Sequence, residues 1–476
     1  MPRHGVFGVE LPTTVAAAPA QVSGLPFVIG VSPINAAEDP AAVGTPVLIR
    51  SFAEFRQKFG YSADTEKYGL CEFAQVFFSL YGQRPMIAVN LVDPATNVTT
   101  VAAADVDVVS HAAAIDVGAV NSNDLVVKTT GGSAVTLVKG TDYVVTYTDD
   151  ACNVVLLPGS TYYTATALNI AYKKINPSAI NAATVVTGLD SIELCATSLG
   201  RTPDVIVAPG YSQNATVAAA MAQKAEGING MFRAIAIVDI DTSSATTVAN
   251  AIAAVTANGL NDKNLIVCWP MVKVGTKKQY LSSHMAACIA MTDANQGGGY
   301  PSVSPSNKPL APVESLVLAS GTAVEMTIDD ANDLEQGGIV TALNYKGTFR
   351  SFGNYTGAAD ADDEKDRFIN FVRMFAFVSN LVADKLWEYL DEPLTYRLVD
   401  SLVDEINMSL NGLVGIGALN GARAEFLPDE NPIDDLKSGI ARIHIYICPI
   451  APFMEAVYYI QYDASYAREA FAGLEI

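Results

Sequence analysis

The residues most suggestive of enzymatic chemistry are Ser282, Ser283 and His284, which place hydroxyl groups beside an imidazole. A serine hydrolase needs such a pair, in which the imidazole takes the proton of the attacking hydroxyl. Adjacent residues on a helix do not face each other, so this tripeptide does not form the pair by itself. The chain also lacks the Gly-x-Ser-x-Gly sequence that exposes a nucleophilic serine. Both observations argue against a hydrolase. The alternative to a structural protein is nevertheless an α/β hydrolase with a β module, which would use Ser283 and His284.

Other patterns fall short of metal, nucleotide and calcium sites. No Gly-Lys dipeptide is present, which excludes a P-loop. The acidic run at 360–366 has neither the glycine nor the glutamate that a calcium loop requires, so it predicts a solvated helix start. Gly415 and Gly417 miss the dinucleotide-binding fingerprint and indicate a bend near a helix end. The four histidines are too scattered for a zinc site: His4, His111, His284 and His444. We expect no cofactor, no metal and no catalytic centre, which favours a structural role.

Composition narrows the function classes further. The 476 residues are 50% hydrophobic, and 29 basic against 50 acidic side chains give a net charge of −21. The apolar content excludes a disordered chain, and the charge excludes nonspecific nucleic-acid binding, which needs a basic face. No segment predicts a membrane span or an export signal, and the six dispersed cysteines predict reduced, buried thiols. The surplus apolar surface points to large cores or to protein–protein contacts.

The first part of the chain predicts an extended arm followed by an α/β region. In residues 1–24, glycines and prolines interrupt any helix among strand-forming residues. Residues 25–95 alternate short apolar strands with helices, one of which begins at Ser51 and another of which covers 68–81. This alternation is typical of a largely buried sheet.

Composition changes sharply over 96–180, which predicts an inserted domain. Residues 97–178 contain no Glu, Phe or Trp, and Thr, Val, Asp and Tyr dominate. Short apolar runs separated by turn residues at hairpin spacing predict a small β-sandwich. Surface loops accept such insertions at small entropic cost.

The α/β pattern resumes over 181–356 and gives way to an α+β region at 357–476. Strands at 204–210, 233–239 and 264–270 alternate with helices at 214–228 and 242–258, which predicts parallel pairing. The final region predicts helices and strands in turn: helices at 362–390 and 394–412, then strands at 441–449 and 455–463.

Several segments, taken in order, resemble one family. They include His4-Gly-Val-Phe-Gly-Val-Glu, Pro203-Asp-Val-Ile-Val-Ala-Pro-Gly, Ser282-Ser-His-Met-Ala-Ala-Cys-Ile-Ala-Met-Thr-Asp, Asn332-Asp-Leu-Glu-Gln-Gly-Gly-Ile-Val-Thr, Gly347-Thr-Phe-Arg-Ser-Phe-Gly-Asn-Tyr-Thr and Gly415-Ile-Gly-Ala-Leu-Asn-Gly-Ala. The set resembles the tail sheath proteins of contractile bacteriophages, most closely the Mu-like branch. The resemblance covers everything except the inserted β domain.

The resemblance implies a multidomain α/β and α+β fold. The middle domain would resemble subtilisin without its catalytic triad, the insertion would face outward, and the C-terminal domain would surround the tail tube. Subunits would form hexameric rings on a helical lattice and contract to drive the tube through the host envelope. The implied partners are further copies of the chain, the tail tube protein, and the baseplate and tail terminator proteins.

The same resemblance implies extended terminal arms that add strands to neighbouring subunits. Strand addition uses main-chain hydrogen bonds, so an arm needs β-prone sequence more than particular side chains. Residues 1–11 and 455–463 fit, and the residues expected to pair are Val6, Phe7, Val9, Leu11, Val457, Tyr459 and Gln461. The alternatives are a frayed N-terminus for the first segment and an ordinary intramolecular strand for the second.

Contact with the tube is expected from the helical region near Lys385 and Arg397, unless the helix that follows Arg397 is simply an amphipathic core helix. The implied location is the virion tail, assembled in the bacterial cytoplasm. A headless contractile particle, such as an R-type tailocin, is the alternative to a complete phage.

Overall fold

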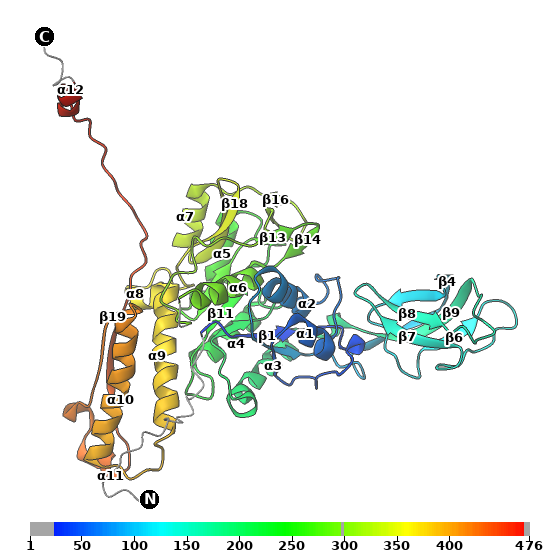
Figure 1. The fold of residues 1–476 in the computed structure, drawn as a ribbon, viewed down its shortest axis with the longest axis horizontal. Coiled ribbons are helices and arrows are strands. Elements are labelled where there is room, and N and C mark those ends of the chain that lie inside the picture. The colour runs from blue at the N-terminus through cyan, green and yellow to red at the C-terminus, as the bar shows by residue number, and fades with distance from the viewer. Residues whose placement is uncertain (1–22, 297–298, 471–476) are drawn as a thin grey trace, which may run out of the picture.

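The computed structural model describes residues 23–296 and 299–470 (Figure 1). A mixed α/β body occupies the centre of the molecule. A small β domain lies at one end of the long axis, and a pair of long helices lies at the other. The mixed architecture with several sheets that the sequence predicts is confirmed.

The body is built on an eight-stranded sheet with the order β18-β17-β12-β11-β10-β1-β3-β2. Its strands are β1 (Pro26–Gly30), β2 (Val47–Ile49), β3 (Met86–Asn90), β10 (Val205–Val207), β11 (Ile235–Asp239), β12 (Leu265–Cys268), β17 (Ile339–Tyr345) and β18 (Thr348–Phe352). The six inner strands run parallel, and β2 and β18 pair antiparallel at the two edges. The parallel pairing predicted for three of these strands is confirmed. Most of the inner strands are buried along their whole length, which explains their uninterrupted apolar sequences.

Helices cover this sheet: α2, α3, α4 and α6 contact its central strands, α3 packs on α4, and the π-helix that continues α2 packs on α6. The helices of the body are α1 (Phe52–Phe59), α2 (Gly69–Ala74, continued by a π-helix at Gln75–Leu80), α3 (Ala182–Leu189), α4 (Ala215–Glu226), α5 (Val248–Ala257), α6 (Leu281–Ala294) and α7 (Ile328–Gln336). The helix predicted to begin at 242 begins at Val248. Asp241 accepts hydrogen bonds from Ser243 and Ser244, and these hold a turn in place of the expected first helical turns.

A second, antiparallel sheet joins the body with the order β14-β13-β15-β16. It consists of β13 (Met271–Val274), β14 (Lys277–Gln279), β15 (Ser315–Val317) and β16 (Ala323–Val324). In the chain, α6 lies between β14 and β15, and almost all of its residues are buried where it contacts β10, β11 and β12 of the large sheet.

The inserted region forms an antiparallel sheet with its own core. Its strands are β4 (Val98–Val109), β5 (Ala112–Asp116), β6 (Val126–Thr129), β7 (Tyr143–Tyr147), β8 (Ala151–Leu156) and β9 (Ala167–Ile175), in the order β6-β9-β4-β5-β8-β7. The sequence predicts a small β-sandwich. Here β4 pairs with β9 along most of its length and with β5 only at Val108 and Val109, so it links two groups of strands that enclose one core. The two ends of the insertion meet where the Asn176 amide donates to the Asn97 carbonyl at 2.7 Å.

The C-terminal region contains α8 (Glu364–Arg367), α9 (Ile369–Trp387), α10 (Tyr396–Gly415), β19 (Leu419–Glu425), α11 (Ile433–Lys437), β20 (His444–Pro449) and α12 (Ser465–Ala470). The side chains of α9 and α10 and those of the β19–β20 hairpin share a core separate from that of the body. The single helix predicted over 362–390 is wrong. Phe368 is extended (φ −80°, ψ 128°) because its backbone forms a β-bridge with Tyr355, which ends α8 and begins α9.

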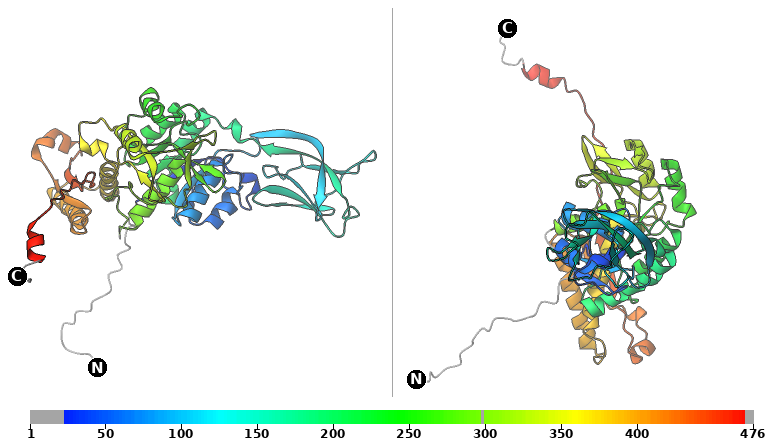
Figure 2. Two further views of the ribbon diagram at one scale, coloured as in Figure 1. Left: turned by 90° about the horizontal axis from the view of Figure 1, so that it is seen from above. Right: turned by 90° about the vertical axis from the view of Figure 1, so that its right-hand side faces the viewer.

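The chain leaves the molecule after β20. The strand predicted at 455–463 has no strand partner within the described residues and runs away from the body to α12 (Figure 2). Within the described residues, this segment therefore does not form the intramolecular strand that is the alternative to an arm.

Candidate functional site

Ser283 and His284 do not form a catalytic pair. Both lie on α6, and the Ser283 hydroxyl donates to the Glu72 carboxylate at 2.9 Å. The imidazole of His284 bonds Gln279 through Nε2 at 2.9 Å and the Tyr81 hydroxyl through Nδ1 at 3.2 Å. Burial lowers the pKa of His284 to about 3, so the ring is neutral. Ser283, His284 and Glu72 are buried within the body, and the hydroxyl bonds the Glu72 carboxyl group in place of the imidazole.

Ser282 belongs to another buried polar cluster. The Asp239 carboxyl, at the end of β11, accepts hydrogen bonds from the Ser282 amide and hydroxyl and from the Ser212 hydroxyl. Burial raises the pKa of Asp239 to about 6 and that of Glu72 well above its ordinary value. These groups lie in the core of the body and tie α6 to the sheet, which is a structural task.

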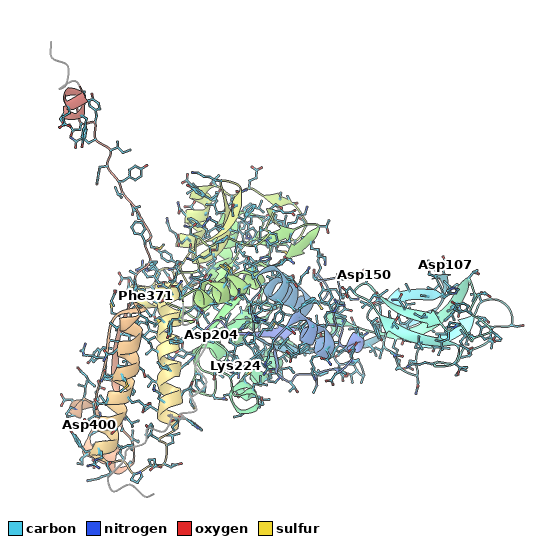
Figure 3. All side chains as sticks on the ribbon, in the orientation of Figure 1. Asp107, Asp150, Asp204, Lys224, Phe371 and Asp400 are labelled. Carbon is cyan, nitrogen blue, oxygen red and sulfur yellow. The ribbon has the colours of Figure 1, made fainter. Side chains whose placement is uncertain are left out.

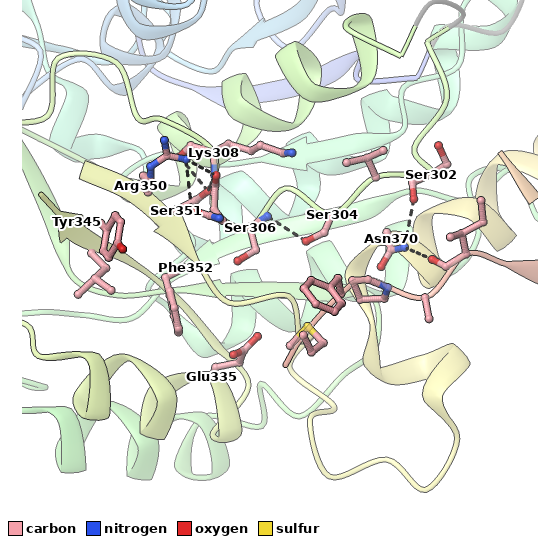
Figure 4. Close-up of a pocket in the computed structure, with 18 of the residues that line it drawn as sticks. Ser302, Ser304, Ser306, Lys308, Glu335, Tyr345, Arg350, Ser351, Phe352 and Asn370 are labelled. Carbon is pink, nitrogen blue, oxygen red and sulfur yellow. Dashed lines mark hydrogen bonds between the residues drawn. The ribbon is translucent and has the colours of Figure 1, made fainter. Parts of the chain in front are cut away.

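A surface cavity of about 700 Å³ lies where the C-terminal segment leaves the body (Figure 4). It is lined by the 302–308 loop, by α7, by β17 and β18, and by residues 450–454. Two of its serine hydroxyls donate to protein groups: Ser304 to Asn354 at 2.7 Å, and Ser351 to the Pro305 carbonyl at 2.6 Å. Both hydroxyls therefore hold the 302–308 loop against β18 and the residues that follow it.

Residues 23–296 and 299–470 contain no cluster of three or more His, Cys, Asp or Glu side chains arranged to hold a metal ion. Among the helices described, none has both the length and the apolar character of a membrane-spanning helix. The six cysteines are free thiols, and Cys448 on β20 is exposed while the other five are buried.

The segment after β20 exposes a row of large apolar side chains. Its exposed fractions are 87% for Phe453, 67% for Val457, 80% for Tyr458, 93% for Tyr459, 88% for Ile460 and 83% for Tyr462. The residues predicted to pair with a neighbour, Val457, Tyr459 and Gln461, are exposed on this segment. Exposed apolar surface of this extent is typical of a protein–protein interface. The other four predicted arm residues, Val6, Phe7, Val9 and Leu11, lie outside the described residues.

The two residues predicted to contact a tube differ in their surroundings. Lys385, near the end of α9, forms an ion pair with Glu405 of α10 at 2.8 Å, and the Tyr389 hydroxyl donates to the same carboxylate at 2.9 Å. These two hydrogen bonds lower the pKa of Glu405. Lys385 therefore joins the two helices. Arg397, in the first turn of α10, is exposed.

One charged cluster was not predicted. Arg373 on α9 is almost completely buried and bonds the carboxylates of Asp293 at 2.5 Å and Asp204 at 3.2 Å. The three residues are far apart in the sequence, and the stripe of apolar residues around Arg373 predicts only a core-facing helix. Figure 3 labels Asp204 close to α9, at the point where body and helix meet.

No family model matches the chain. The tail sheath protein of Burkholderia phage BcepMu is 26% identical over 481 residues, covering 96% of this chain and 95% of that protein. The tail sheath protein of Escherichia phage P2 is 26% identical over 40% of this chain and 48% of its own length.

Solved structures agree in fold over almost the whole chain. An anti-feeding prophage baseplate chain gives a TM-score of 0.60 at 14% identity, covering 97% of this chain and 99% of that one. A sheath chain of the contracted PVC extracellular contractile injection system gives 0.58 at 14% identity, over 98% and 99%. The sheath tail protein of Desulfitobacterium hafniense gives 0.52 at 10% identity, over 94% and 98%. The predicted resemblance to contractile tail sheath proteins is confirmed.

Proposed function

We propose that this chain is the structural subunit of a contractile tail sheath, which polymerises around a tail tube and contracts to drive that tube through a host envelope. The observation that carries the proposal is similarity over 96% of the chain to a tail sheath protein, together with a sheath fold over almost the same length. Ser283 bonds Glu72 and His284 bonds Gln279, and both side chains are buried. Because the hydroxyl and the imidazole do not bond each other, a structural role is favoured over a hydrolase.

The exposed C-terminal segment supports polymerisation by strand addition. Residues 455–463 are extended, strand-forming and unpaired within the described residues, so their backbone amides and carbonyls are available to a sheet edge of another copy. The donor segment and the acceptor edge are different surfaces, and such heterologous contacts generate open helical growth. Residues 1–11 would act in the same way at the other end of the chain.

A substitution at Tyr459 tests this assembly mode. Tyr459→Pro removes a backbone donor and is expected to abolish polymers, because proline interrupts a strand ladder. Tyr459→Thr keeps the donor and strand propensity and is expected to assemble. Tyr459 is 93% exposed, so neither change should alter the thermal unfolding of the monomer. Negative-stain electron microscopy of both variants would refute the strand-addition proposal if the proline variant still formed striated tubes.

The shape of the molecule supports an orientation in the sheath. The inserted sheet and the α9–α10 pair lie at opposite ends of the long axis, so one end can face the tube while the other faces outward (Figure 1). We propose that α10 and Arg397 face the tube and that the β domain faces outward.

We also propose hexameric rings, contacts with baseplate and tail terminator proteins, assembly in the host cytoplasm, and a subtilisin-like middle domain at 25–95 and 181–356.

Contraction would draw on energy stored during assembly. In this proposal the extended lattice is metastable, and the contracted lattice gains buried contact area between subunits. Isolated contracted sheaths should then stay contracted in the absence of nucleotide. Spontaneous return to the extended form, or a requirement for ATP, would refute the mechanism.

A headless contractile particle is the second candidate. Two of the structural neighbours come from an anti-feeding prophage and an extracellular contractile injection system, which favours it specifically. Particles purified from the producing bacterium would distinguish the two by electron microscopy. DNA-filled heads on the tails would support a phage, and tails closed by a cap alone would support the headless particle.

A further inference from the structure

Two buried polar residues of α9 bond the chain just before β1 and just after β20. We call residues 23–25, where the described chain begins, the N-terminal exit, and Ile450 the C-terminal exit. Asn370 and Arg373 are three residues apart and therefore lie on one face of the helix. Both are almost completely buried, with exposed fractions of 1% and 3%. Asn370 bonds the beginning of the C-terminal segment, and Arg373 bonds the end of the N-terminal one.

The Arg373 contacts fix the N-terminal exit. The guanidinium donates to the Ser23 hydroxyl at 2.9 Å and binds Asp293 through both terminal nitrogens. The Asp204 carboxylate, which also contacts Arg373, accepts from the Gly24 and Leu25 amides at 2.9 and 2.7 Å. Charge-assisted bonds of this kind are shorter and stronger than neutral ones. The backbone entering β1 is therefore held by a carboxylate that α9 holds in turn.

The Asn370 contacts fix the C-terminal exit. Its amide nitrogen donates to the Ile450 carbonyl at 3.1 Å, directly after β20, and to the Ser302 carbonyl at 3.3 Å. Its oxygen accepts from the Asn354 side chain at 3.1 Å, and Asn354 is itself bonded by Ser304 at 2.7 Å. Asn370 is the side chain that bonds the half-buried Ile450 carbonyl, so removing it costs a hydrogen bond and loosens that position.

The helix between these contacts is stiff and well anchored. Met374 and Phe377, one and four residues beyond Arg373, pack in the C-terminal core. Two turns beyond Arg373, Asn380 bonds the Arg233 backbone at both its amide and its carbonyl, at 2.7 and 2.8 Å. Both terminal exits thus depend on one turn of a helix that is tied to the body at a third point.

We propose that α9 couples the two terminal exits, so that a displacement at one exit is transmitted through Asn370 and Arg373 to the other. In the assembled sheath, which rests on the proposed function, tension on one arm would reach the other arm through α9. The load would bypass the inserted domain and most of the central sheet. The coupling itself is a property of the single chain and is measurable without assembly.

The experiment uses the intact monomeric chain with one reporter at each exit. Hydrogen exchange of the Gly24 and Leu25 amides reports on the N-terminal exit. A nitroxide on Cys448, the one exposed thiol among the described residues, reports on the C-terminal exit two residues from Ile450. The variants are Arg373→Met and Asn370→Ala, with Asn380→Ala as the matched control on the same helix face.

We expect each α9 variant to affect both reporters. Arg373→Met should speed exchange at Gly24 and Leu25 by about tenfold or more, as expected for loss of a buried charged partner, and should also raise nitroxide mobility at Cys448. Asn370→Ala should raise that mobility and also speed exchange at Gly24 and Leu25, because coupling is reciprocal. Asn380→Ala removes a contact two turns away from the turn that touches both exits, so it should leave both reporters nearly unchanged.

Changes confined to the nearer exit would overturn the proposal, and so would equal changes from Asn380→Ala, which would indicate general loosening. If Arg373→Met does not fold, Arg373→Lys retains the charge, loses the two-pronged contact with Asp293, and gives the same test. A chain that shows coupling but never forms tubes would contradict the sheath proposal alone. A chain that forms tubes with independent exits would contradict only the coupling.

Discussion

Two carboxyl groups, those of Glu72 and Asp239, lie in the core of the body, and within the described residues they are bonded only by hydroxyl and amide groups. Burial without a cationic partner favours the neutral acid, which explains their raised pKa values. Each acid bonds one of the two serines at the start of α6. At this scale, side chains that suggest catalysis in the sequence serve to hold a buried helix in place.

The raised pKa of Asp239 makes stability depend on pH. The folded chain holds this proton up to about pH 6, whereas the unfolded chain releases it near 3.8. The unfolded state therefore gains stability relative to the folded state as pH rises through this window, by about 3 kcal/mol for a shift of about two units. Asp239→Asn imitates the protonated acid and should lack this loss.

Urea unfolding of both proteins between pH 4 and 7 provides the measurement. The wild-type chain should lose about 2 kcal/mol relative to the Asn variant over that range, because a part of the full effect is already lost at pH 4. Asp360→Asn, at an exposed carboxylate, is the control and should run parallel to the wild type. Parallel curves for wild type and Asp239→Asn would contradict the buried-acid explanation.

The buried contacts of single residues were the least predictable part of the molecule. The spacing of Ser283 and His284 correctly argued against a pair, because helix geometry is local. The Arg373 cluster gave no such signal, since its carboxylates come from positions 204 and 293 and meet only when β10, α6 and α9 are packed together. Contacts between distant segments depend on the tertiary fold, which no local spacing encodes.

At the scale of elements, α10 offers a direct test of local stability. The Thr395 hydroxyl accepts the Leu398 amide at 3.2 Å and caps the helix start. Thr395→Ala should cost about 1 kcal/mol, whereas Thr395→Ser keeps the oxygen and should cost much less. Hydrogen exchange in the first turns of α10 would measure the difference. Equal exchange in the two variants would show that the cap contributes nothing.

Arg397 tests the proposed contact between α10 and the tube. Its exposed side chain can be reversed with little structural cost, because an acidic residue in the first helical turn is favoured by the helix dipole. Arg397→Glu should reduce the fraction of sheathed tubes by about tenfold or more, since like charges across an interface repel. Arg397→Lys should sheath normally, and both variants should melt like the wild type.

The outcome would be read from electron micrographs of mixtures with purified tail tubes. Normal sheathing by Arg397→Glu would exclude a charge-based role for this residue. Lys385→Glu is unsuitable as the probe, because it places two carboxylates together at Glu405 and disturbs the α9–α10 contact.

Elements with strong local signals were predictable, and their interruptions were not. The parallel strands of the body are short apolar runs flanked by turn residues, so pattern alone identifies them. The break at Phe368 arises from a bridge to Tyr355, which the continuous apolar stripe hides. Residues 455–463 have the composition of a strand but no partner within the described chain, and composition does not reveal whether the partner lies in the same molecule.

At the scale of the whole molecule, acidity and apolar content act in opposite directions on assembly. The segment 97–178 carries seven acidic and four basic residues, a net of −3, so −18 of the total −21 belongs to the rest of the chain. The exposed C-terminal segment favours association through apolar contact, while the charge opposes the approach of a second copy. We infer that repulsion keeps free subunits apart until a tube nucleates them.

Salt separates these two contributions, because it screens repulsion between exposed charges. The Debye length falls from about 30 Å at 0.01 M to about 3 Å at 1 M ionic strength. Sedimentation of the chain alone should therefore shift from monomer toward polymer as sodium chloride is raised. Binding to tubes through Arg397 should respond in the opposite direction, since screening weakens attraction between unlike charges. Chloride is preferable to sulfate, which also strengthens apolar association. Tyr459→Pro should remain monomeric throughout, because it lacks the strand contact that screening would expose. Self-assembly that stayed constant or fell with salt would contradict charge repulsion as the barrier.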